Sequence, residues 1–211
     1  MSEPKSIMQI MSEIAVDPQD PYGPQLRKCG IVPSLMFSFF SSPITNTKPQ
    51  AVFTPVDVYK YIISDKAKAR TEQLRSFVDV KQARNFKTYN FDYCTFSGTF
   101  NTRNDNALIQ HSGLLCLDFD HLQNLDDVRR NLLNDECFDT QLLFRSPSGD
   151  GLKWVVEINI SQMSHADYFR AVANYLVQTY DFVVDQSGKD VSRACFLPHD
   201  PNCFINPKFL K

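Results

Sequence analysis

The stretch that decides the fold is Leu114-Leu115-Cys116-Leu117-Asp118-Phe119-Asp120. An apolar run this short is typical of a buried strand, and side chains on a strand alternate between its two faces. Asp118 and Asp120 therefore share one face, where the strand emerges from the core. Adjacent carboxylates repel each other unless a proton or a cation lies between them, and Mg²⁺ and Mn²⁺ prefer oxygen ligands. The stretch predicts a divalent-metal site at a strand end; the alternative is two solvent-facing aspartates.

A second polar stretch, residues 183–193, could complete such a site. Its sequence is Val-Val-Asp-Gln-Ser-Gly-Lys-Asp-Val-Ser-Arg, which offers a third carboxylate, either Asp185 or Asp190. It also offers Arg193, whose guanidinium can hold a phosphate through two parallel hydrogen bonds. The alternative is a polar loop in which an aspartate pairs with the arginine.

A third stretch, residues 144–154, is a turn rich in serine and glycine: Phe-Arg-Ser-Pro-Ser-Gly-Asp-Gly-Leu-Lys-Trp. Glycines let backbone N–H groups approach an anion, and Arg145 and Lys153 would add positive charge. The GxxxxGK[ST] order of a P-loop is absent, and the alternative is an ordinary β-hairpin. Together the three stretches supply what phosphoryl or nucleotidyl transfer needs, namely carboxylates for metal ions and cations for a triphosphate.

The composition is that of an ordinary globular protein. The chain has 211 residues, the size of one domain with a full core, and 43% of them are hydrophobic. No apolar run approaches the ~20 residues that span a membrane, and no secretory signal opens the chain, so we expect a cytoplasmic protein. The six cysteines show no CxxC spacing, which favours reduced thiols over a zinc site.

Charge is unevenly distributed along the chain, although the net charge is only −2. This total excludes a globally basic nucleic-acid binder. Within residues 60–87, however, three acidic residues are outnumbered by eight basic ones: Lys60, Lys66, Lys68, Arg70, Arg75, Lys81, Arg84 and Lys87. Such a stretch could hold a phosphate backbone beside an acidic metal site. The alternative is the solvated face of a helix.

Local signals predict strands and helices in mixed order. Strands are expected over residues 35–40, 91–96, 113–120, 140–144, 152–158 and 193–197. Helices are expected from the cap at Thr54 to about Val80, in one or two pieces, after the cap at Asn124, and after the capping-box-like start at Ser164. Hairpins mixed with single helices predict an α+β fold with a largely antiparallel sheet flanked by helices, and the nearest small unit is the split βαβ type. Residues 1–30 predict an irregular arm, and residues 31–211 a single domain.

Four motifs in a fixed order carry a family resemblance. They are Gly-Thr-Phe-Asn-Thr-Arg at 98–103, His-Ser-Gly-Leu-Leu-Cys-Leu-Asp-Phe-Asp at 111–120, Ser-Pro-Ser-Gly-Asp-Gly-Leu-Lys at 146–153, and Asp-Val-Ser-Arg-Ala-Cys-Phe at 190–196, followed by Asp-Pro at 200–201. Through them, residues 54–207 resemble the primase–polymerase domain of the archaeo-eukaryotic primase superfamily. The most similar variety is the VirE-type N-terminal domain of bacterial mobile elements.

The motifs assign particular residues to the superfamily pattern. Its first motif, hydrophobic-Asp-hydrophobic-Asp, falls on Asp118 and Asp120, and its third best fits Asp185, with Asp190 as the rival. The second motif usually ends in histidine, where this chain has Lys153, the form expected in the VirE-like variety.

The resemblance implies both a fold and an activity. The fold has an N-terminal α/β part and an RRM-like antiparallel sheet flanked by helices. The activity is that of a template-directed nucleotidyltransferase, a DNA primase or polymerase, with two Mg²⁺ or Mn²⁺ ions on the catalytic residues Asp118, Asp120 and Asp185. The nucleoside triphosphate would contact Arg145, Ser148, Gly149, Gly151, Lys153 and Arg193. The template or primer would contact Lys66, Lys68, Arg70, Lys87 and Arg103.

The resemblance also implies partners and a setting. The partners are a single-stranded or primed DNA template and a helicase domain or helicase protein, in the bacterial cytoplasm and without a membrane. Because the sequence stops at Lys211, we expect an excised domain or a stand-alone copy. Two other functions stay open: a non-catalytic nucleic-acid-binding or replication-initiation module of the same fold, and a metal-dependent nuclease. His111, which precedes the aspartate strand, either orients a ligand or is an ordinary turn histidine.

Overall fold

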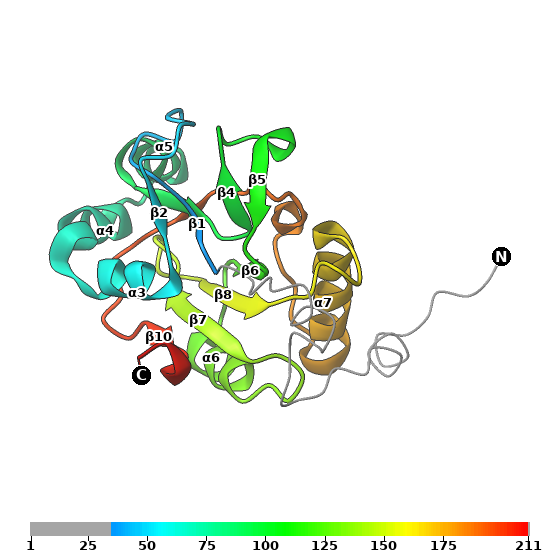
Figure 1. Cartoon of the computed structure of the whole chain (residues 1–211). Helices are drawn as coiled ribbons and strands as arrows, with labels where there is room; N and C mark the ends of the chain where they lie inside the picture. The colour runs from blue at the N-terminus through cyan, green and yellow to red at the C-terminus, as the bar shows by residue number, and fades with distance from the viewer. Residues whose placement is uncertain (1–34, 211) are drawn as a thin grey trace.

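Two four-stranded sheets, a two-stranded ribbon and several helices form a mixed α+β fold, which confirms the predicted fold class (Figure 1). The structure, a computed structural model, describes residues 35–210. The irregular arm expected over residues 1–30 lies outside the described residues. Every strand pairing in residues 35–210 is antiparallel, as expected.

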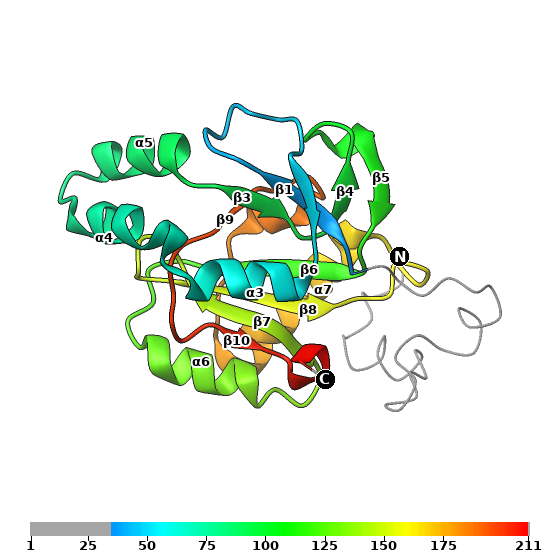
Figure 2. The ribbon, with the colours of Figure 1, turned by 60° about the vertical axis from the view of Figure 1, so that its left-hand side comes forward.

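The sheet that carries Asp118 has the strand order β10-β7-β8-β6. Its strands are β6 (Leu114–Phe119), β7 (Thr140–Arg145), β8 (Leu152–Glu157) and β10 (Phe204–Ile205). Helix α6 (Leu125–Leu133) connects β6 to β7, and β8 lies between these two strands. This is the expected split βαβ arrangement. Helix α7 (His165–Tyr180) follows β8 and, with α6, covers one face of the sheet (Figure 2).

Both faces of this sheet are buried, because side chains of β6 alternate between two cores. Leu115, Leu117 and Phe119 pack in the core that α6 and α7 share with the sheet. Leu114 and Cys116 point the other way, toward helix α3 (Pro55–Ile63) and the other sheet. The same alternation places Asp118 on this second face, near the end of the strand.

The other four-stranded sheet has the order β2-β1-β3-β9. Its strands are β1 (Phe37–Phe40), β2 (Ala51–Phe53), β3 (Tyr93–Thr95) and β9 (Cys195–Phe196). Strand β9 comes after β8 and α7 in sequence, so residues 186–194 lead the chain from the Asp118 sheet back to the β2-β1-β3-β9 sheet. Strands β4 (Gly98–Phe100) and β5 (Leu108–His111) form the separate ribbon. Single 3₁₀ turns are η1 (Asp65–Ala67), η2 (Asp105–Ala107), η3 (Gln186–Lys189) and η4 (Pro207–Leu210).

The helical stretch after Thr54 begins as predicted but extends further. Thr54 and Asp57 form a reciprocal capping box at the start of α3. Helices α4 (Lys68–Ser76) and α5 (Val80–Asn90) then project together from one end of the sheets (Figure 2). Helices α3 and α4 match the two expected pieces, but a further helix, α5, begins after its cap at Asp79 and was not foreseen. Helix α5 contributes no buried residue, so it has no apolar stripe by which a sequence pattern could reveal it.

The remaining helix caps are confirmed, and four short strands were not foreseen. Asn124 caps α6 and Ser164 caps α7, each accepting a hydrogen bond from the backbone N–H three residues later. Strands β2, β4, β5 and β10 have only two to four residues, too few for an alternating pattern to be read. Within residues 35–210 all five cysteines are free thiols, and no helix is long and apolar enough to cross a membrane.

Candidate metal centre

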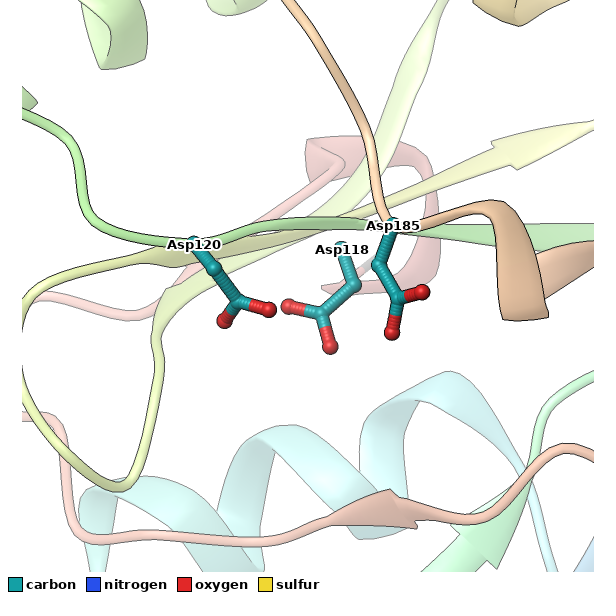
Figure 3. Close-up of side chains that lie close together, drawn as sticks. All are labelled: Asp118, Asp120 and Asp185. Atoms are coloured by element: carbon teal, nitrogen blue, oxygen red, sulfur yellow. The ribbon is translucent and has the colours of Figure 1, made fainter. Parts of the chain in front are cut away.

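Three carboxylates converge beside the end of β6. Asp118 is the fifth residue of that strand, Asp120 follows its last residue, and Asp185 is the N-cap of η3. Each offers an oxygen, and these three oxygens lie within 4.8 Å of one another (Figure 3). The backbone N–H of Asp185 donates to the carbonyl oxygen of Asp118 at 2.9 Å. This bond holds the segment after α7 against the edge of β6.

Asp118 has one oxygen that the described protein does not satisfy. Its Oδ2 forms an ion pair with Nζ of Lys153, which lies directly opposite on β8. Its Oδ1 is buried and has no hydrogen-bond partner within residues 35–210. A buried polar atom without a partner is costly, so an unsatisfied oxygen on a carboxylate that lies beside two others fits a bound cation. A set made only of carboxylate oxygens suits Mg²⁺ or Mn²⁺.

Lys153 is the buried cation of the centre. Its side chain is only 11% exposed. Strand β8 lies between β6 and β7, and the β2-β1-β3-β9 sheet packs against this face. Burial lowers the pKa of the Lys153 amine, while the thiols of Cys195 and Cys116 act in the opposite direction. The ammonium group and the Asp118 carboxylate thus neutralise each other at the floor of the site.

Asp185 is held ionised and oriented by its own turn. Ser187 donates to it through its backbone N–H at 3.0 Å and its hydroxyl at 2.7 Å. Arg193 donates from Nη2 at 2.7 Å. Burial by itself would raise the pKa of Asp185, but the Ser187 hydrogen bonds and the charges of Arg193 and Lys153 outweigh it and lower the pKa. Asp185 is therefore a carboxylate at neutral pH.

Asp190, the rival third ligand, lies apart from the carboxylate group. It lines the same pocket as Asp118, Lys153 and Arg193. Its carboxylate, however, pairs with Lys189 at 3.2 Å and contributes no oxygen to the group of three. Of the two candidates that the sequence left open, Asp185 is the one that the fold brings to Asp118.

The serine- and glycine-rich turn between β7 and β8 flanks Asp120. A Cβ on Gly151 would lie 2.1 Å from the carbonyl oxygen of Phe119, so only glycine allows this approach. Gly149 has φ +88°, and its N–H donates to the carbonyl oxygen of Ser146 within the turn. The carbonyl oxygen of Gly149 accepts from the Arg145 guanidinium. Triphosphate binding by Arg145, Ser148, Gly149 and Gly151 stays a prediction.

Arg75, on α4, is a contact that sequence reasoning did not single out. Its guanidinium donates to the carbonyl oxygens of Pro147 and Ser146, each at 3.2 Å. It thereby joins the helical part of the chain to the turn beside Asp120. It belongs to the basic stretch of residues 60–87, but nothing in the sequence distinguishes it from its basic neighbours there.

The five residues expected to contact nucleic acid divide into exposed and structural cations. Lys66 and Lys68 are exposed, and Lys87 is half-buried over the Phe196 ring. Arg70 is tied to Asp92 at 2.9 Å. Arg103 donates to the Tyr93 hydroxyl at 3.2 Å and to the Ile44 carbonyl oxygen at 3.3 Å, which fixes the loop after β1. Nucleic-acid binding by these residues stays a prediction, and Arg70 and Arg103 already have structural partners.

Comparison with known proteins places the chain in a family. Residues 85–204, more than half of the chain, match the family described as BT4734-like, N-terminal domain, and this range contains all three carboxylates, Lys153 and Arg193. No curated protein matches the chain. Among solved structures, it is similar to the polymerase domain of Mycobacterium tuberculosis Ligase D in complex with DNA, with 17% identity and a TM-score of 0.32. That similarity covers 44% of this chain and 40% of the other, so the chain spans less than half of its structural neighbour. On the family match, the chain belongs to the BT4734-like N-terminal domains.

Proposed function

We propose that this chain is a metal-dependent, template-directed nucleotidyltransferase of the primase–polymerase type. The observation that carries the proposal is the convergence of Asp118, Asp120 and Asp185, together with a buried Asp118 oxygen that has no hydrogen-bond partner within residues 35–210. Support also comes from the four motifs that resemble the archaeo-eukaryotic primase superfamily in its VirE-type variety. On this proposal the three aspartates hold Mg²⁺ or Mn²⁺, with two ions per site.

The chemistry divides between the ions and the side chains around them. Bound ions would neutralise the triphosphate and lower the pKa of the primer 3′-hydroxyl. Asp185 and Asp118 supply negative charge that would attract these ions. Lys153 neutralises part of that charge through its ion pair with Asp118. Arg193 is 47% exposed and already oriented by Asp185, so its free N–H groups can bind phosphate oxygens. A DNA template or primer would lie along two exposed lysines, Lys66 of η1 and Lys68 of α4.

A second candidate is supported by the Lys153–Asp118 ion pair. An ammonium on the central carboxylate already neutralises it, which would suit a fold that binds nucleic acid without catalysis. On this reading the chain is a replication-initiation module, and the carboxylates are structural. In either case we propose a DNA partner and a replication module of a bacterial mobile element, working with a helicase domain or protein.

Nucleotide incorporation separates these candidates. Purified chain is given labelled nucleotides with Mg²⁺ or Mn²⁺ on primed and on unprimed DNA. We expect synthesis by the unchanged chain and its loss in Asp120→Asn and Asp185→Asn. Asp120 is the better test of the metal site because it is exposed, so its charge can be removed without leaving Lys153 unpaired. Asp126→Asn, an exposed carboxylate in the first turn of α6, is the matched control.

The outcomes differ for each candidate. Asp190→Asn should keep most activity if Asp185 is the third ligand, and should lose it if the assignment is reversed. Absence of synthesis together with normal, salt-sensitive binding of single-stranded DNA would refute the enzyme and support the binding module. Metal-dependent cleavage of the DNA in place of synthesis would instead support a nuclease.

A further inference from the structure

Two histidines form a hydrogen-bond chain that ends on the turn carrying Asp185. His111 is the last residue of β5, and His165 is the first residue of α7. The backbone N–H of Gly113 donates to Nδ1 of His111 at 2.9 Å. Nε2 of His111 lies 3.0 Å from Nδ1 of His165, and Nε2 of His165 lies 3.3 Å from the carbonyl oxygen of Gly188.

The first donor in this chain fixes every proton after it. Because Gly113 donates to Nδ1 of His111, that nitrogen carries no proton, and the proton of His111 is on Nε2. His111 then donates to Nδ1 of His165, which leaves the proton of His165 on Nε2, facing the Gly188 carbonyl oxygen. Both rings are therefore the same neutral tautomer, with the proton on Nε2.

The surroundings keep both rings neutral. Burial, together with the neighbouring His165, lowers the pKa of His111 to about 4. Burial also lowers the pKa of His165, against the Gly188 carbonyl and the charges of Asp105 and Asp190, which raise it. At neutral pH the chain is thus a set of directed neutral hydrogen bonds.

The accepting residue, Gly188, is packed too closely to carry a side chain. A Cβ at this position would lie 2.6 Å from Cε2 of Phe169 and 3.4 Å from the carbonyl oxygen of Cys116. The N–H of Gly188 donates to the carbonyl oxygen of Asp185 at 3.2 Å. A hydrogen bond that holds Gly188 therefore also fixes the single turn that Asp185 begins.

We propose that His165, oriented by His111, is a positioning residue that holds Asp185 at the metal centre. It lines the pocket beside Asp118 but gives no atom to the group of three carboxylate oxygens. It acts through Gly188, in the way that groups behind metal ligands orient them in other proteins. The inference rests on the proposed metal site, and it assigns to His111 the orienting role that the sequence left open.

Binding of Mn²⁺ alone tests the proposal without any activity assay. Free Mn²⁺ is measured by electron paramagnetic resonance during titration of the protein, and the melting temperature of each variant is recorded. His165→Phe keeps a planar ring without donors, and we expect its Kd for Mn²⁺ to rise about tenfold. His165→Gln places an amide N–H near the former Nε2, so it should recover most of the affinity.

A matched control separates positioning from general stability. His199 is half-buried, its Nδ1 lies 2.9 Å from the carbonyl oxygen of Ser64, and it does not line the pocket that Asp118 and His165 share. His199→Phe removes a similar imidazole–carbonyl contact, so it should lower the melting temperature and leave the Kd for Mn²⁺ unchanged. If His165→Phe does not fold, His111→Asn, which keeps an acceptor for Gly113 but cannot reach His165, should weaken Mn²⁺ binding several-fold.

Two results would overturn the inference in different ways. If the unchanged chain binds Mn²⁺ and His165→Phe binds it equally well, His165 does not position Asp185, and the proposed metal site survives. If the unchanged chain does not bind Mn²⁺, both the metal site and the inference fail. Nitrogen chemical shifts of the imidazoles give a metal-free readout. We expect a proton on Nε2 of both His111 and His165, and a proton on Nδ1 of His165 would refute the proposed hydrogen-bond chain.

Discussion

Replacing Lys153 by methionine should destabilise the protein strongly, and a metal ion should reverse part of the loss. Methionine keeps the length and apolar stem of the side chain but removes the charge that faces Asp118 on the neighbouring strand. The carboxylate is then left in a site that is mostly closed to water, and its Oδ1 already has no hydrogen-bond partner in the part of the chain that the structure describes. Two unpaired oxygens on one buried anion are the cause of the expected loss.

The magnitude follows from the burial of the pair. The side chains of Lys153 and Asp118 are 11% and 18% exposed, so solvent screens them little. Removing one partner of a buried ion pair costs about 3–5 kcal/mol. For a chain of this size, each kcal/mol shifts the melting temperature by about 2–4 °C, so a decrease of roughly 6–20 °C is expected. Lys68→Met, which removes the exposed pair with Asp65, should cost less than about 1 kcal/mol.

Urea unfolding of four proteins measures this directly: the unchanged chain, Lys153→Met, Asp118→Asn and the double variant. We expect the double variant to lose less stability than the sum of the single variants, because it leaves no buried charge. Saturating Mn²⁺ should restore stability to Lys153→Met and not to the double variant. A loss below about 1 kcal/mol in Lys153→Met, or strict additivity in the double variant, would refute the reasoning.

Three further predictions concern the packing around the site. Gly188→Ala should cost about 1–3 kcal/mol in urea unfolding, since its Cβ would meet the Phe169 ring at 2.6 Å; an unchanged midpoint would mean that the ring yields freely. The pKa of His111 is lowered from 6.5 to about 4, so the unfolded chain binds more protons between these pH values, and up to about 3 kcal/mol of stability present at neutral pH should be lost on acidification to pH 4. The free energy of unfolding of His111→Asn should depend less on pH than that of the unchanged chain. Parallel curves of unfolding free energy against pH for the two proteins would contradict this. Trp154→Phe removes a buried donor to Thr140 Oγ1 at 2.7 Å and should lower stability by about 1–3 kcal/mol in a thermal melt, whereas Thr140→Ser, which keeps the acceptor, should lose less.

The strand at 114–119 could be predicted because its pattern and its burial arise from the same residues. The apolar run identified a core strand, and the period of two correctly placed both aspartates at its end. The residues alone left Asp185 and Asp190 open, since they lie five residues apart in one polar loop, and only the family resemblance favoured Asp185. The choice between them depends on where a single 3₁₀ turn docks against β6, which no local pattern encodes.

Other parts of the site were missed for different physical reasons. His165 has the sequence position of an ordinary first-turn residue after a serine cap, so its link to Gly188 is purely tertiary. Arg75 and the exposed cations of residues 60–87 are equivalent in sequence, and only packing against the turn at 146–147 distinguishes Arg75. Helix α5 buries no side chain, so it lacks the apolar stripe by which helices are found.

The alternation along β6 also constrains how the protein can evolve. Its six residues encode the helix-covered core on one face and the aspartate side on the other. Insertion or deletion of a single residue within the strand would exchange the two faces. Asp118 would then point into the hydrophobic core, and a leucine or phenylalanine would point toward the other carboxylates. Substitutions can accumulate in this strand, but changes of length cannot. Sequence divergence among relatives should therefore lengthen or shorten the loops around β6 while the strand itself keeps its length.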